Sequence, residues 1–178
     1  GWPDRDPGPG ALFASMTARE MRRTLLEDLQ SVPHARGVNN HMGSKLMEER
    51  DSIRAVFRVL REKGLYFVDS VTTDVSVAPE LAEETSVLFA RRDLFIDDAE
   101  DRSRAALHLK KLLDTRDSWN ELLLIGHPYP ETVSALEEMI PRFTAAGIRV
   151  VRLSEQVGGR QGLRNEKPQR NTNRNQTP

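Results

Sequence analysis

Four short apolar runs, separated by longer stretches with helical spacing, constrain the fold of this chain more than any other feature. The runs cover residues 37–38, 65–68, 87–90 and 122–125. Polar residues follow the first three directly, and His127 follows the fourth after Gly126. Strands that alternate with helices favour an α/β fold with a parallel sheet. Because the carboxyl ends of parallel strands face the same side, we expect the polar residues to meet at one mouth.

The stretches between the apolar runs predict helices with one buried face. The expected helices cover residues 17–30, 45–63, 77–84, 101–115 and 131–146. Ser15 and Thr17 are both N-cap candidates for the first helix, and Glu20 would complete a capping box with Thr17.

The last helix is followed by a further predicted strand and then by a polar tail. In that helix the spacing predicts that Val133, Leu136 and Ile140 face the core, with a kink at Pro141. The apolar residues 148–151 predict the last strand. We expect residues 1–157 to form one domain, and the polar residues 158–178 to be disordered because they bury too little apolar surface.

Composition and charge exclude several classes of function. The 178 residues carry 26 basic and 27 acidic side chains without a sustained basic stripe, so a nucleic-acid surface is not indicated. The chain has no cysteine, and any metal would therefore need His, Asp or Glu ligands. No apolar run approaches the roughly 20 residues that span a bilayer. The segment at residues 1–10 is rich in proline and glycine, and we expect further chain upstream of it.

The octapeptide at residues 37–44 is the strongest candidate for part of a functional site. In it, His41 stands between two asparagines and a Gly-Ser turn. The alternative is that the asparagines and Ser44 cap the following helix, while His41 is an ordinary loop residue. The octapeptide alone does not separate these two interpretations.

Three other strand ends carry side chains that would meet His41 at the mouth. Asp69 follows the second apolar run, Arg92 and Asp93 follow the third, and His127 follows the fourth. Each has a structural alternative: Asp69 can cap a turn, Asp93 can pair with a neighbouring arginine, and His127 can hold the proline-rich loop. We favour a shared site, because four separate coincidences are less plausible than one common cause.

Taken together, these motifs resemble the divergent polysaccharide deacetylase family of bacteria. The resemblance runs over about residues 1–153 and is carried by residues 37–44, 67–73, 91–97 and 125–132. It implies an irregular or incomplete (β/α) barrel of the polysaccharide deacetylase-like type, with a divalent metal such as zinc at the C-terminal mouth. It also implies an N-acetylated glycan or cell-wall polysaccharide as partner, and a location in the bacterial periplasm or cell envelope.

The resemblance also implies roles for the candidate residues. His41 matches a metal ligand, and His127 matches a late histidine that acts as an acid or stabilises the transition state. Asp69 and Asp93 are candidates for the base, for an orienting carboxylate or for a substrate contact. The remaining candidate substrate contacts are Asn39, Asn40, Arg92 and Tyr129, the last beside His127 where it could stack on a sugar ring.

The chain departs from the family pattern at its beginning. The family opens with a strand that ends in paired aspartates and later adds a histidine motif, and neither precedes the Pro-Gly-rich segment here. One histidine cannot form the usual site of three zinc ligands. Missing strands would also leave a sheet edge that favours homo-oligomers.

Three functions stay open. The first is a metal-dependent deacetylase that is inactive as this shortened chain. The second is a non-catalytic carbohydrate- or protein-binding relative without the metal. The third is a different metal-dependent hydrolase on the same scaffold.

Overall fold

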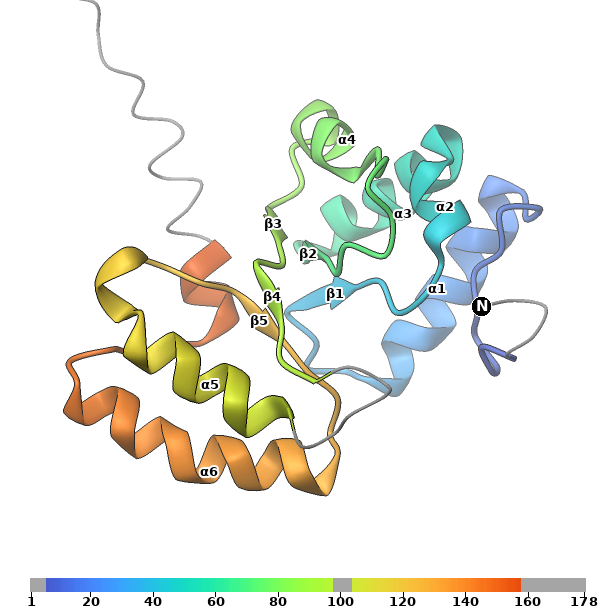
Figure 1. The fold of residues 1–178 in the computed structure, drawn as a ribbon. Helices are drawn as coiled ribbons and strands as arrows, with labels where there is room; N and C mark the ends of the chain where they lie inside the picture. The colour runs from blue at the N-terminus through green and yellow to red at the C-terminus, as the bar shows by residue number, and fades with distance from the viewer. Residues whose placement is uncertain (1–5, 98–103, 158–178) are drawn as a thin grey trace, which may run out of the picture.

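The computed structural model describes residues 6–97 and 104–157, which form two parallel sheets with helices around them (Figure 1). The first sheet has the order β1-β2-β3, and the second pairs β4 with β5. Every pairing is parallel, which confirms the predicted α/β class, and the described residues form no closed barrel. The strands are β1 (Gly37–Asn39), β2 (Tyr66–Asp69), β3 (Phe89–Arg91), β4 (Leu94–Phe95) and β5 (Leu124–Ile125).

The helices divide into two groups that accompany the two sheets (Figure 1). The first group is α1 (Ala18–Ser31), α2 (Ser44–Glu48), α3 (Arg50–Lys63) and α4 (Ala78–Thr85). The second group is α5 (Arg104–Asp114) and α6 (Pro130–Ala145), which pack side by side. A 3-10 turn, η1 (Arg116–Ser118), follows α5, and residues 153–157 form a last helical turn. In the described ranges, none of these helices has the length and apolar character that crossing a bilayer requires.

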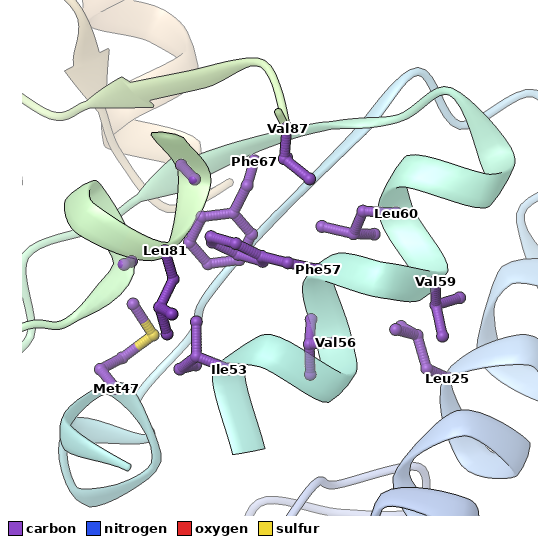
Figure 2. Close-up of a cluster of buried hydrophobic side chains, with 12 residues drawn as sticks. Leu25, Met47, Ile53, Val56, Phe57, Val59, Leu60, Phe67, Leu81 and Val87 are labelled. Atoms are coloured by element: carbon purple, nitrogen blue, oxygen red, sulfur yellow. The ribbon is translucent and has the colours of Figure 1, made fainter. Parts of the chain in front are cut away.

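The larger core lies between the first sheet and its helices. Phe57 and Leu60 of α3 are fully buried, and the Phe57 ring packs against Phe67 of β2 at a centroid distance of 5.0 Å (Figure 2). Leu81 of α4 and Leu25 of α1 complete this cluster from either side. Apolar burial of this kind stabilises a domain by about 25 cal/mol per Å² of surface removed from water.

A second core and a connecting cluster complete the described structure. The second core lies between α5, α6 and the residue after β4, and contains Ile96, Ala105, Leu109, Ala135, Met139 and Phe143. The connecting cluster joins the two sheets and consists of Val68, Ala90, Leu123 and Val157. The predicted tail, residues 158–178, and the first residues of the helix predicted from residue 101 lie outside the described residues.

The single long helix predicted over residues 45–63 is wrong, because the chain breaks at Glu49. This residue has an extended ψ of 101°, ends α2 and begins α3. The carbonyl of Met47 accepts a hydrogen bond from the backbone N–H of Val77 at 2.9 Å, where an unbroken helix would use it internally. A contact with the segment before α4 therefore replaces a helical hydrogen bond.

The predicted buried face of α6 is wrong by one position. The buried residues are Thr132, Ala135, Met139 and Phe143, whereas Val133 and Ile140 are exposed and Leu136 is half-buried. Pro141 lies inside this helix, as predicted. The Thr132 hydroxyl donates a hydrogen bond to a buried carboxylate, so a polar contact sets the rotation of the helix.

The strand predicted at residues 148–151 is also wrong. These residues pair with no strand of the described ranges, and Val150 is 59% exposed. The predicted strand at residues 122–125 is shortened to two residues, because the N–H of Leu123 donates to the carboxylate of Asp93 instead of to a backbone carbonyl. Whether these residues form strands depends on pairing with a neighbouring strand, and the periodicity of the sequence contains no information about that pairing.

The predicted capping box at the start of α1 is confirmed. Thr17 is the N-cap, its hydroxyl accepts from the N–H of Glu20 at 3.3 Å, and its N–H donates to the Glu20 carboxylate at 2.8 Å. The hydrogen bonds from the backbone N–H and side chain of Thr17 lower the pKa of Glu20 from its ordinary value. The box therefore satisfies two backbone N–H groups that a helix start leaves open.

Replacing Thr17 with alanine is expected to lower the free energy of unfolding by about 1 kcal/mol, since the helix loses its N-cap. Because the pKa of Glu20 is lowered in the folded state, its contribution is complete above the ordinary pKa and disappears as the pH falls through the lowered value. Urea denaturation at pH 7 and at pH 3 would measure both effects. Ser15→Ala, the other N-cap candidate, is the matched control and should change neither.

Candidate functional site

The ends of β1 and β5 bring two of the predicted site residues together. His41 follows β1 and His127 follows β5, and their rings lie 6.0 Å apart between centroids at an angle of 88°. The two residues are far apart in sequence and belong to different sheets. The structure therefore confirms that these strand ends meet, as the parallel arrangement predicted.

Asp97 holds His127 in place and is not among the site residues predicted from the sequence. One carboxylate oxygen accepts from Nδ1 of His127 at 2.9 Å. The other accepts from the backbone N–H of His127 at 2.7 Å and from the hydroxyl of Thr132 at 2.6 Å. Asp97 is fully buried, whereas the His127 side chain keeps 27% of its surface exposed. An ionised carboxylate only accepts hydrogen bonds, so Nδ1 carries a hydrogen and Nε2 is left to exchange protons.

The register of the second sheet explains why Asp97 reaches His127. Phe95 of β4 pairs with Ile125 of β5, and two residues beyond this pair stand Asp97 and His127. The intervening Gly126 allows the close approach, since a Cβ there would lie 2.8 Å from Cγ1 of Ile96 and 3.2 Å from the Asp97 carboxylate. An aspartate directly after an apolar pair, at the same offset as a histidine after the partner strand, is the sequence signal that would have identified this pair.

Two aromatic rings contact His127. The Phe95 ring meets it edge-on at a centroid distance of 5.1 Å, and Tyr129 lies at 5.0 Å with an angle of 34°. Tyr129 thus lies beside His127, and its predicted contact with a sugar ring stays a prediction.

Two of the predicted substrate contacts, Asn39 and Asn40, hold the loop that follows β2. Asn39 donates to the hydroxyl of Ser70 at 3.1 Å. Asn40 accepts from the N–H of Ser70 at 2.8 Å and donates to the hydroxyl of Thr72 at 3.0 Å. Through these hydrogen bonds the two asparagines, at the end of β1, hold the loop after β2 in its conformation. Their predicted contact with substrate stays a prediction.

Arg92 holds the same loop from the side of β3. Its Nε donates to the carbonyl of Ser70 at 2.7 Å and one terminal nitrogen donates to the carbonyl of Val71 at 3.1 Å. The guanidinium also lies 5.4 Å from the centre of the Phe95 ring. Val71 has a φ of +56°, which is strained for a β-branched residue, and such strain persists only where surrounding contacts over-determine the backbone.

The two predicted carboxylates, Asp69 and Asp93, occupy different environments. Asp69 is buried; one oxygen accepts from the N–H of Val71 at 2.8 Å, and the other has no hydrogen-bond partner among the described residues. Asp93 stands before β4, where its carboxylate accepts from the N–H of Leu123 at 2.7 Å. Asp69 therefore shapes the loop at the mouth, and Asp93 connects the start of β4 to β5. Their predicted roles in catalysis stay predictions.

The described residues do not fit the divalent metal site that the family resemblance implies. No group of three or more His, Asp or Glu side chains with metal-binding geometry occurs within residues 6–97 and 104–157. Nδ1 of His127 is already bonded to Asp97, and His41 is exposed. Since catalytic zinc usually has three protein ligands, this part of the chain does not supply the set.

An open cavity of about 1230 Å³ adjoins β1 and β5. Its lining includes β1, β5, residues 148–151, and Leu136 and Phe143 of α6. β1 and β5 are each the last strand of their sheet. The cavity therefore lies between two sheet edges.

The fold and the site define an α/β protein in which the ends of parallel strands hold an aspartate–histidine pair at an open mouth. The chain belongs to the divergent polysaccharide deacetylase family, whose sequence pattern matches residues 1–157.

The chain is similar in sequence to two curated bacterial proteins. The chain is 33% identical over 129 residues to the uncharacterized protein YibQ of Escherichia coli K12. The aligned region covers 72% of this chain and 40% of YibQ. It is 31% identical over 159 residues to an uncharacterized protein of Haemophilus influenzae, covering 89% of this chain and 54% of that protein. The chain thus spans about half the length of these relatives.

A solved structure has the same fold. The crystal structure of the uncharacterized protein ATU2773 from Agrobacterium tumefaciens C58 matches with a TM-score of 0.80 and 21% sequence identity. The match covers 88% of this chain and 63% of that one.

Proposed function

We propose that this protein removes acetyl groups from an N-acetylated polysaccharide of the bacterial cell envelope. The observation that carries the proposal is the buried Asp97 bonded to Nδ1 of a partly exposed His127. Cleavage of an amide needs a proton on the departing amine, and an imidazolium at Nε2 can donate it. Asp97 stabilises the positive charge of this imidazolium and keeps the ring oriented. Membership of the deacetylase family supports the same reaction class.

We further propose that the two sheets belong to an incomplete (β/α) barrel and that the protein acts in the periplasm or cell envelope. The exposed edges of β1 and β5, with the cavity between them, offer room for additional strands. The greater length of the relatives supports this. A divalent metal, zinc by analogy with the family, would need ligands beyond the described residues, with His41 as the candidate from this chain.

The test measures acetate release from an N-acetylated glucosamine oligomer, with the protein produced at the full length of its relatives. His127→Ala is expected to lower kcat at least roughly 10²-fold, because the proton donor is lost. His34→Ala is the matched control, since His34 is exposed in the loop before β1. An unmodified protein that releases no acetate, or a His127→Ala variant with full activity, would rule out the proposal.

A second function, binding of a carbohydrate or protein without catalysis, is favoured by one observation. The described residues lack a cluster of three metal-binding side chains. Under this alternative the mouth would bind the glycan, and calorimetry would detect that binding while no acetate appears. Titration with Zn²⁺ separates the two functions, because only the deacetylase would gain activity with metal.

A further inference from the structure

The positive charge of Arg92 has no carboxylate partner within residues 6–97 and 104–157. Its two hydrogen bonds go to backbone carbonyls, which orient the guanidinium without neutralising its charge. Other arginines behave differently: Arg22, Arg50 and Arg54 each form an ion pair with a glutamate. Arg92 is half-buried, as Arg50 and Arg54 are, so the difference lies in the partner and not in the burial.

The acidic side chains nearest the mouth are already engaged or turned inward. Asp97 is fully buried and bonded to His127 and Thr132. Asp69 is 1% exposed, and the carboxylate of Asp93 accepts from the N–H of Leu123. Arg92, His41 and His127 keep exposed surface at the mouth. Asp93 is also exposed, but one of its carboxylate oxygens is bonded to the backbone of Leu123.

The Phe95 ring connects Arg92 with the proposed proton donor. The guanidinium carbon of Arg92 lies 5.4 Å from the centre of the Phe95 ring, and the centre of the His127 ring lies 5.1 Å from it. A group bound at Arg92 would thus belong to the sugar unit at His127 or to its neighbour. The two backbone contacts fix the guanidinium before binding, which reduces the entropy lost when a ligand is ordered.

We propose that Arg92 binds a carboxylate of the substrate, so that the protein prefers acidic N-acetylated glycans to neutral ones. The planar guanidinium matches a carboxylate through paired hydrogen bonds, and the N–H groups not used by the loop carbonyls are the donors. This inference rests on the proposed function, because it assigns the substrate class of the same mouth.

The experiment compares two N-acetylated oligosaccharides that differ only in a carboxyl group on one sugar. Binding is measured by calorimetry and turnover by acetate release, with the full-length protein. We expect the acidic oligosaccharide to bind roughly tenfold to hundredfold more tightly, and the preference to shrink at high salt. Arg92→Gln should abolish the preference, Arg92→Lys should keep part of it, and Arg91→Gln should keep all of it. Arg91 is exposed at the end of β3, which makes it the matched control.

The ratio of the affinities for the acidic and the neutral oligosaccharide shows whether Arg92 recognises the carboxylate or only supports the loop. A loosened loop would weaken the binding of both oligosaccharides equally. If Arg92→Gln does not fold, the salt dependence of the unmodified protein and the Arg92→Lys ratio decide instead. Equal affinity of the unmodified protein for both oligosaccharides, or an unchanged ratio in a folded Arg92→Gln variant, would overturn the inference. Acetate release without a preference would leave the deacetylase function standing. A preference in binding without acetate release would instead contradict the deacetylase function.

Discussion

Replacing Asp97 with alanine is expected to lower the free energy of unfolding by about 3–5 kcal/mol. The substitution leaves the backbone N–H of His127 and the hydroxyl of Thr132 without their acceptor, and each unsatisfied buried donor costs about 1–3 kcal/mol. It also releases α6 from the contact that sets its rotation. Urea denaturation followed by circular dichroism would measure the change.

The conservative Asp97→Asn variant separates stability from chemistry. Its amide can still accept one of the hydrogen bonds, so we expect a smaller loss of stability than with alanine. It cannot stabilise an imidazolium, and acetate release should fall roughly 10²-fold to 10⁴-fold. Asp114→Asn, at the exposed end of α5, is the control. Full activity in folded Asp97→Asn would show that His127 does not depend on this carboxylate.

Replacing Phe57 with alanine should destabilise the protein by about 3–5 kcal/mol, through lost burial and the cavity left behind. Phe57 is fully buried against Phe67 and lies at the centre of the larger core (Figure 2). Thermal and urea unfolding would both record the loss.

Leu107→Ala provides the matched control for the core substitution. Leu107 is 64% exposed on α5, so its truncation should change the free energy of unfolding by less than about 0.5 kcal/mol. If the two variants were equally stable, the packing around Phe57 would not be the main support of the first sheet.

The predictions that succeeded depend on local chemistry. The capping box of Thr17 and Glu20 uses residues three apart in the sequence. The alternation of apolar runs and helices likewise predicted parallel strands, and with them the meeting of His41 and His127.

The predictions that failed depend on contacts between distant segments. The break at Glu49 follows from a hydrogen bond with Val77, and the buried face of α6 follows from the bond between Thr132 and Asp97. Asp97 itself was missed because its partner, His127, lies 30 residues further along the chain. Helical periodicity contains no information about such partners, and only the register of the second sheet provides it.

The connecting cluster of Val68, Ala90, Leu123 and Val157 has a consequence for how the protein unfolds. The two larger cores lie on different sheets, and among the described residues this cluster packs side chains from both halves together. Cooperative melting of the two halves as one thermodynamic unit therefore depends on a few side chains, one of them in the helical turn at residues 153–157. The distance between His41 and His127 depends on the same cluster, because His41 follows β1 in one half and His127 follows β5 in the other. If the packing of the connecting cluster loosened, the two histidines would move apart before either core unfolded.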